Sequence, residues 1–184
     1  MQILKKYLKH ISLLSCFVVV PFLTIALASK ADLLKYNFTH LSSQTNSVAL
    51  YFIWAISTIL TASLAIYAIK KKYNLYKPTK KQVVTLTIVM LASSFTPYNS
   101  NDNLISFIHV SSDYIVLIYF NYILFTLYNF LKLNNNKRII KVSYFYVLSF
   151  STCFVLSMMF GSISSLVEII YTISTSLLLG ILLY

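Results

Sequence analysis

The chain alternates between long apolar stretches and short polar segments along its whole length. The apolar stretches cover residues 11–29, 48–69, 83–96, 104–132, 142–160 and 166–184. A helix needs about 20 apolar residues to cross the hydrocarbon core of a bilayer. Because the runs are continuous and do not alternate with polar residues, they predict helices and argue against the strands of a membrane barrel. We therefore expect a single all-α domain over residues 1–184, a transmembrane bundle of six spans.

Two of the six stretches differ from a plain span. The first contains Pro21, which predicts a kink, and its end at Ala28 resembles a signal-peptidase site, so cleavage there remains an alternative. The stretch 83–96 is short, and it crosses only if the lysines before it extend to the surface or the bilayer thins. Thr79, with Gln82 three residues later, predicts a capping box at the start of that helix.

Composition agrees with a location in a membrane. Of the 184 residues 58% are hydrophobic, and the mean hydropathy is +0.76. A soluble domain of this length would carry far more polar surface. Both cysteines, Cys16 and Cys153, lie within apolar stretches, which argues against a disulfide framework. We expect a multi-pass protein of a bacterial cytoplasmic membrane, with the lipid bilayer as its first partner.

The basic residues indicate the orientation of the chain. Fifteen Lys and Arg against four Asp and Glu give a net charge of +11. Thirteen of the fifteen lie in the N-terminal tail and in the turns 70–81 and 132–141, whereas the first loop, 30–47, holds two. The positive-inside rule then places both termini in the cytoplasm. Because these charges flank apolar spans, we interpret them as topological signals and expect no nucleic-acid partner.

The rarer polar residues gather on the opposite side. This orientation places all four acidic residues and two of the three histidines at or near the outer face. His109 and Asp113 are four residues apart, so on a helix they share one face. Asn121 follows two turns later on a similar face. The candidate outer polar pocket therefore consists of Asp32, His40, Asp102, His109, Asp113, Asn121 and Glu168.

Glu168 is the acidic residue with the most apolar sequence around it. A carboxyl group placed a turn below the membrane surface costs a few kcal/mol unless it finds a partner, so we expect it to face the bundle. Tyr171, Thr172 and His109 are the candidate donors. Proton or substrate handling and a structural hydrogen bond between helices are both compatible with this placement.

A few residues resemble a known family of membrane proteins. They are Asn46 before the second span, Phe95 and Pro97 after the third, His109 at the fourth and Glu168 at the sixth. In these the chain resembles the bacterial six-span family called domain-of-unknown-function family 998, which is distantly similar to DRAM-like proteins. The resemblance implies a multi-pass membrane protein and brings no established activity.

Two classes of function follow from these residues. The first is a non-enzymatic protein that uses the outer pocket to bind or transport a small solute or to contact a membrane-protein partner, without a cofactor. The second is an intramembrane hydrolase whose metal is held by His109 and Asp113 together with Glu168. The chain lacks the P-loop, the nucleophile elbow and the HExxH motif, so the sequence favours the first class and leaves the second open.

Overall fold

The computed structural model describes residues 2–34, 36–44, 46–96, 103–133, 137–160 and 163–184. Throughout these ranges the regular structure is helical, as the apolar pattern predicted. In chain order the helices are α1 (Gln2–Leu14), the π-helical η1 (Ser15–Val19), α2 (Val20–Ala28), the 3₁₀ helix η2 (Phe38–Ser43), α3 (Val48–Lys72), α4 (Lys80–Phe95), α5 (Asn103–Leu133), α6 (Lys137–Phe160) and α7 (Ser165–Leu183).

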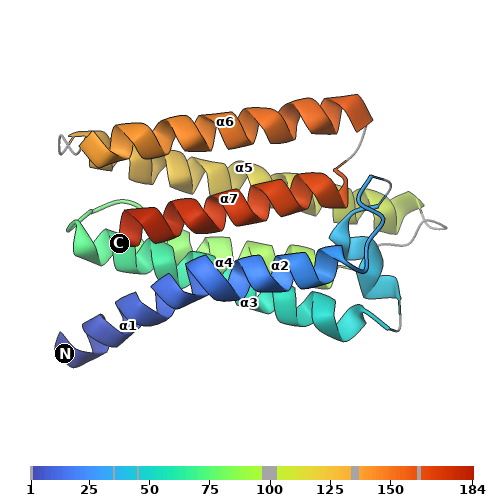
Figure 1. Ribbon diagram of the computed structural model, residues 1–184, viewed down its shortest axis with the longest axis horizontal. Helices are drawn as coiled ribbons and strands as arrows, with labels where there is room; N and C mark the ends of the chain where they lie inside the picture. Colours follow the sequence, from blue (N-terminus) through green and yellow to red (C-terminus); the bar gives the residue numbers. More distant parts are fainter. Residues whose placement is uncertain (1, 35, 45, 97–102, 134–136, 161–162) are drawn as a thin grey trace.

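The long helices lie side by side in one elongated bundle (Figure 1). α7 packs against α2, α3 and α6, and α4 lies between α3 and α5. Both ends of the chain are at one end of the bundle, while η2 and the first loop cover the other end (Figure 1). With α1, η1 and α2 counted as one rod, the described helices pass along the bundle six times.

Five helical segments within the described residues are long and apolar enough to cross a membrane. They are Tyr7–Ala28, Val48–Lys72, Leu104–Lys132, Val142–Met159 and Ser165–Leu183. These segments agree closely with five of the predicted apolar stretches and confirm the membrane-type helical character of the chain. α4 has 16 residues, fewer than a crossing normally requires, so the sixth span stays a prediction.

The π-helical segment η1 in the first rod has a covalent cause, the missing backbone N–H of Pro21. In η1 the Val20 N–H donates to the carbonyl oxygen of Ser15, five residues back. The same pattern would pair position 21 with the Cys16 carbonyl, but proline has no N–H to donate. Ser176 of α7 replaces the missing donor, since its Oγ lies 2.8 Å from Cys16 O. The kink predicted at Pro21 therefore takes the form of a π-helical segment that is tied to α7.

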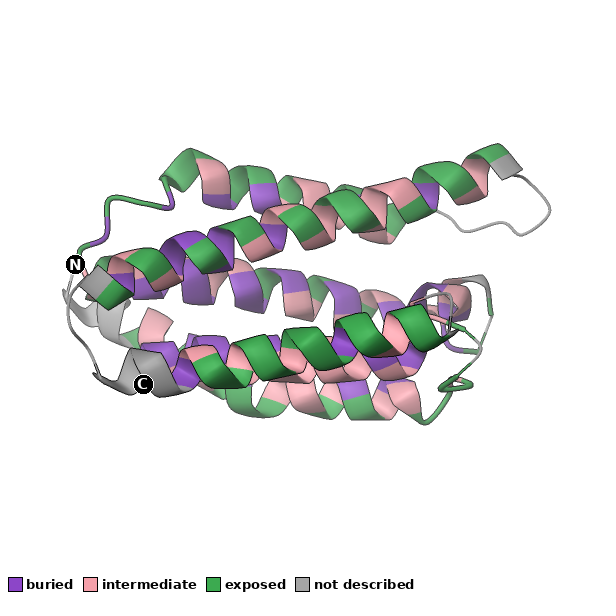
Figure 2. Cartoon of the chain, turned by 90° about the horizontal axis from the view of Figure 1, so that it is seen from above, coloured by how far each residue is buried: buried purple, intermediate pink, exposed green. Residues whose placement is uncertain are grey.

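Small side chains bring α3 close to its neighbours. Ala62, Ala65 and Ala68 are buried, and Ser63 Oγ lies 2.7 Å from Thr87 Oγ1 of α4. Lipid tails are as apolar as leucine, so the hydrophobic effect contributes little between helices in a bilayer, and close packing and hydrogen bonds hold them together. Exposed residues lie along the outward faces of the helices, where lipid would contact them (Figure 2).

Two helix ends show how local sequence satisfies backbone groups. Thr79 N donates to Gln82 Oε1 at 2.7 Å, and Gln82 N donates to Thr79 Oγ1 at 3.2 Å, which confirms the predicted capping box of α4. At the C-terminal end of α7, Lys72 Nζ and Tyr73 OH donate to the Leu182 carbonyl at 3.3 and 3.1 Å. The end of α7 is thus held by residues that close α3.

Candidate functional site

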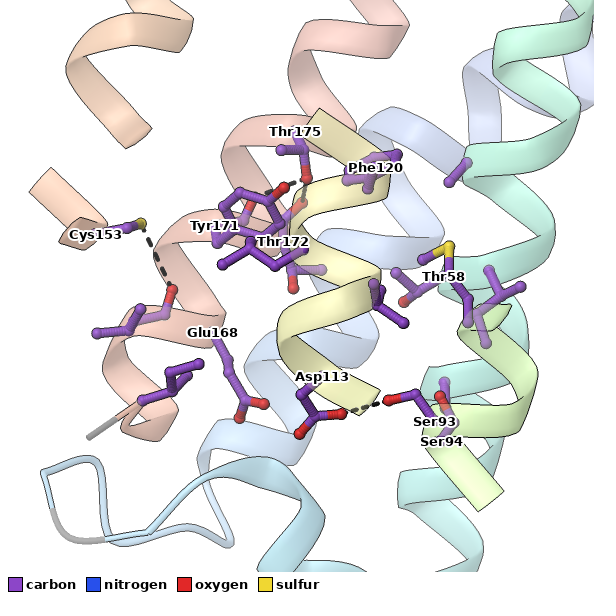
Figure 3. Close-up of a pocket in the computed structure, with 18 of the residues that line it drawn as sticks. Thr58, Ser93, Ser94, Asp113, Phe120, Cys153, Glu168, Tyr171, Thr172 and Thr175 are labelled. Atoms are coloured by element: carbon purple, nitrogen blue, oxygen red, sulfur yellow. Dashed lines mark hydrogen bonds between the residues drawn. The ribbon is translucent and has the colours of Figure 1, made fainter. Parts of the chain in front are cut away.

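A cavity of about 470 Å³ lies inside the bundle (Figure 3). Side chains of α3, α4, α5, α6 and α7 line it, and Thr39 of η2 lies against it from the first loop. Much of the wall is apolar, with residues such as Ala55, Phe120 and Phe154. A cavity of this size, mostly apolar with a few polar groups, has the dimensions of a small-molecule site, which span about 300–1,000 Å³.

Two of the four acidic residues of the chain line this cavity. Asp113 comes from α5 and Glu168 from the first turn of α7, and Figure 3 shows both carboxyl groups at the same end of the space. The other lining residues in the described part of the chain are uncharged. The cavity therefore has one acidic end and a largely apolar body.

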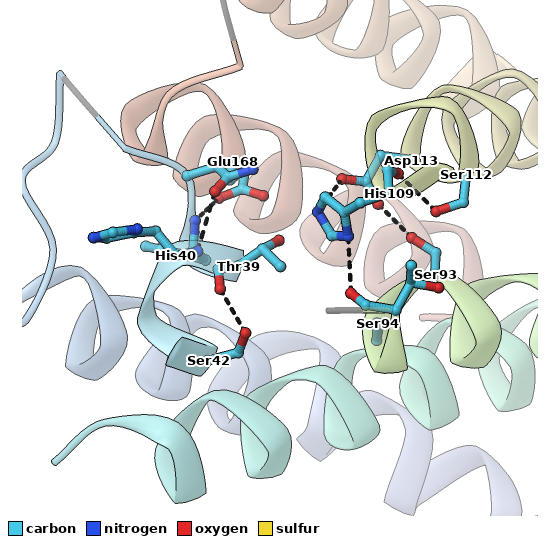
Figure 4. Close-up of polar contacts among 12 residues, drawn as sticks. Thr39, His40, Ser42, Ser93, Ser94, His109, Ser112, Asp113 and Glu168 are labelled. Atoms are coloured by element: carbon cyan, nitrogen blue, oxygen red, sulfur yellow. Dashed lines mark hydrogen bonds and ion pairs between the residues drawn. The ribbon is translucent and has the colours of Figure 1, made fainter. Parts of the chain in front are cut away.

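Glu168 is held by the backbone of the first loop. Its Oε2 accepts a hydrogen bond from the Phe38 N–H, which belongs to the first residue of η2 (Figure 4). Glu168 also lies in the first turn of α7, where the helix dipole stabilises a negative charge. These two effects offset part of the cost of placing a carboxylate at this depth.

The same loop satisfies the N-terminal amides of α7. Ser165 donates to the Tyr36 carbonyl from both its backbone N, at 2.7 Å, and its Oγ, at 2.6 Å. Leu166 N donates to the Leu33 carbonyl at 3.0 Å. The first N–H groups of a helix have no partner within the helix, so loop carbonyls take over the role of a side-chain cap. The first loop is thereby fixed across the acidic end of the cavity.

Asp113 lies in a second group of polar contacts at this end. Its Oδ1 accepts a hydrogen bond from Ser93 Oγ of α4, and its Oδ2 lies 3.1 Å from His109 Nε2 (Figure 4). The contact confirms the prediction that His109 and Asp113 share one helix face. The other ring nitrogen, His109 Nδ1, lies 2.9 Å from the Thr96 carbonyl oxygen. His109 is buried, with a relative exposure of 1%, whereas Asp113 is 29% exposed.

This arrangement determines where the protons of His109 and Asp113 lie. A carbonyl oxygen only accepts, so His109 Nδ1 must carry the proton that it donates to Thr96. With Nδ1 protonated, an unprotonated Nε2 would direct its lone pair at a carboxylate oxygen 3.1 Å away, which is repulsive. The contact is favourable when one further proton lies between the two groups. His109 and Asp113 thus share one proton and together carry no net charge.

Hydroxyl groups lie deeper in the cavity. Thr172 and Thr175 project from α7, and Thr175 Oγ1 donates to the carbonyl of Tyr171 at 2.7 Å. Thr58 of α3 is different, because its Oγ1 is shielded from solvent and has no hydrogen-bond partner among the described residues.

The predicted pocket residues take different positions in the structure. Asp113 and Glu168 line the cavity, and His109 lies behind Asp113. Asp32 is exposed, with its Oδ1 near Leu34 N at 3.3 Å, and the His40 ring stacks on Tyr36 at 4.2 Å; neither is a lining residue.

Asn121 and Asp102 complete the predicted set. Asn121 lies outside the lining, where it donates to Tyr171 OH at 3.0 Å and accepts from Tyr146 OH. Asp102 lies outside the described residues. Within the described residues, three or more His, Cys, Asp or Glu side chains do not come together in a group that would hold a metal ion. The pair of His109 and Asp113 on its own supplies too few ligands for a typical zinc site.

Several residues at the acidic end of the cavity were not predicted from the sequence. Ser93, Thr39 and Tyr51 come from α4, η2 and α3, and Tyr51 OH donates to the Ser94 carbonyl at 3.3 Å. Serine, threonine and tyrosine are frequent along the apolar stretches, so their identity alone does not separate lining residues from lipid-facing ones. A hydroxyl-bearing residue on the same helix face as an acidic residue is the signal that would have improved the prediction.

Comparison of the chain with models of protein families, with curated proteins and with solved structures finds no match. The resemblance to domain-of-unknown-function family 998 therefore stays a prediction.

Proposed function

We propose that the chain crosses the membrane six times and places both termini in the cytoplasm. Support comes from the distribution of basic residues, thirteen of fifteen of which lie in the N-terminal tail and the two basic turns. In the bundle both termini lie at the end opposite the first loop (Figure 1). This topology directs the acidic end of the cavity outward. α4 then has to cross with the help of Lys80 and Lys81, which are exposed at its start.

Reporter fusions test this topology. Fusions after Lys72, Asn101 and Tyr184 should report inside, outside and inside, because successive spans alternate in direction. The measurement combines alkaline phosphatase activity, which requires export, with green fluorescent protein fluorescence, which requires the cytoplasm. A phosphatase signal after Tyr184 would contradict the six-span arrangement and leave α4 as a helix that does not cross.

We further propose that the protein binds a small amphiphilic solute in the cavity, for transport or for sensing, without acting as an enzyme. The observation that carries this proposal is the shape and polarity of the cavity, with two carboxyl groups at one end of an otherwise largely apolar space of about 470 Å³. A solute with an apolar body and one polar end matches that distribution. Structural packing alone would be served better by filling such a space than by leaving it.

Trp54 provides a built-in reporter of binding. It is the single tryptophan of the chain, and it lines the cavity. In purified protein in lipid nanodiscs, the neutral probe N-phenyl-1-naphthylamine should accept excitation energy from Trp54 in a saturable way. The substitution Ser157→Phe should reduce this saturable transfer by about tenfold, because the new ring projects into the cavity.

Thr152→Phe is the matched control for Ser157→Phe. Both hydroxyl side chains lie on α6 and donate to the carbonyl four residues back at 2.9 Å, but Thr152 is exposed and does not line the cavity. Its substitution should leave the transfer unchanged. Non-saturable transfer in the wild type, or equal effects of the two substitutions, would show that the probe resides in lipid and would refute the binding proposal.

A further inference from the structure

The charged residues around the cavity indicate which chemical class of solute the proposed binding function would serve. Asp113 and Glu168 are the charged residues among the described lining, where lysine and arginine do not occur. The basic side chain of His109 lies against Asp113 and shares a proton with it. Glu168 accepts a hydrogen bond from the neutral Phe38 N–H, and among the described residues it forms no ion pair with a basic side chain. A cation bound beside Glu168 would favour the ionised form of its carboxyl group, and the described residues would then leave one uncompensated negative charge at this end of the cavity.

The aromatic residues of the cavity favour the same class of solute. Tyr51 and Trp54 of α3, Phe120 of α5 and Tyr171 of α7 all line it. The negative face of an aromatic ring attracts a cation, and the interaction strengthens where water is excluded. The Trp54 ring is fixed, because its Nε1 donates to Thr24 Oγ1 of α2 at 3.0 Å. Fixed aromatic side chains near a carboxylate are a common way to bind an organic ammonium group.

The position of the carboxyl groups defines how such a solute would lie. Both are at the end of the cavity beneath the first loop, while the remaining wall is largely apolar (Figure 3). A metal ion or an inorganic cation would leave the apolar body unfilled. A cation that carries several positive charges would exceed the single negative charge available. The apolar body would take hydrocarbon or aromatic rings.

We infer that the cavity binds a lipophilic organic cation with one positive charge, whose charged centre lies between Asp113 and Glu168. This inference rests on the proposed binding function and adds the charge of the solute to it. The positive centre pairs with the charge of Glu168, and the apolar body extends between α3, α5, α6 and α7.

Probes of similar shape and different charge test this inference. Tetraphenylphosphonium is a monovalent cation, tetraphenylborate is its anionic counterpart, and triphenylphosphine oxide is a neutral relative. In nanodiscs that contain the wild-type protein, each would compete with N-phenyl-1-naphthylamine for energy transfer from Trp54. The cation should displace the probe at a concentration about tenfold lower than the neutral oxide or the anion requires. Equal displacement by all three would overturn the inference.

Two substitutions assign the preference to the acidic end. Glu168→Gln removes the uncompensated charge and should reduce the advantage of the cation over the neutral oxide to about threefold or less. Asp32→Asn removes a charge from the exposed first loop and should leave the advantage intact. A cation preference that persists in Glu168→Gln and disappears in Asp32→Asn would assign it to surface charge and refute the site.

The results separate this inference from the proposed function. Saturable transfer to N-phenyl-1-naphthylamine that depends on Ser157, with no preference for tetraphenylphosphonium, would retain the binding function and refute the cationic solute. Loss of the saturable transfer itself would refute both. The comparison among the three probes uses the wild-type protein, so it holds even if a substitution impairs folding.

Discussion

Glu168→Lys should prevent the protein from accumulating in the membrane, whereas Glu168→Gln should leave its amount close to that of the wild type. Lysine would remove the acceptor of the Phe38 N–H, which costs about 1–3 kcal/mol for a buried donor. It would also place a cation in the first turn of α7, where the helix dipole is unfavourable by up to about 2 kcal/mol. The sum is a large part of a typical stability of about 5–15 kcal/mol.

Glutamine isolates the role of the charge at this position. Its side-chain carbonyl still accepts from the Phe38 N–H, so we expect a loss of only about 1 kcal/mol. The amount of folded protein is measured by fluorescence-detected gel filtration, and its stability by thermal unfolding in the same detergent. If Glu168→Lys unfolded at the wild-type temperature, residue 168 would have to face water. The contact between residue 168 and the first loop would then contribute nothing to stability.

His109→Leu should have the second largest effect on stability. The substitution leaves the Thr96 carbonyl without its donor and Asp113 without its shared proton. Breaking a fully buried ion pair costs about 3–5 kcal/mol, but Asp113 is 29% exposed, so water lowers the cost to about 2 kcal/mol. The measurement is the free energy of unfolding in mixed micelles of detergent and denaturing surfactant.

A second substitution separates the charge of Asp113 from the loss of packing at His109. In the double variant His109→Leu, Asp113→Asn the amide requires no counter-ion, and it still accepts the hydrogen bond from Ser93. We expect the double variant to recover about 1 kcal/mol relative to His109→Leu alone. A double variant that is less stable than His109→Leu would show that the unpaired charge of Asp113 does not cause the loss of stability in His109→Leu.

Local sequence features predicted the parts of this structure that depend on local physics. The apolar stretches predicted the helices because five of the six are each long enough to span a bilayer by themselves. The spacing of His109 and Asp113 predicted their contact because helix geometry alone brings residues four apart together. The same holds for Thr79 and Gln82, whose capping box lies within one helical turn.

The partner of Glu168 shows why the rest of the site was not predictable. We expected a side chain such as Tyr171 or Thr172, but the donor is the backbone N–H of Phe38, 130 residues earlier in the chain. Every residue except proline has that group, so no residue type marks it. The cavity itself results from how helices far apart in sequence pack against each other. Likewise, only the folded loop shows that Asp32 and His40 lie outside the lining.

The contacts that α7 makes with earlier segments also constrain the order of assembly during synthesis. Ser176 completes the hydrogen bonding of the Cys16 carbonyl, and the N-terminal turn of α7 binds the backbone of the first loop. α7 leaves the ribosome after all the other described helices. Until it inserts, the first rod retains an unpaired carbonyl beside Pro21 and Phe38 lacks the acceptor for its N–H. Insertion of α7 is therefore the step that completes these hydrogen bonds and the wall of the cavity.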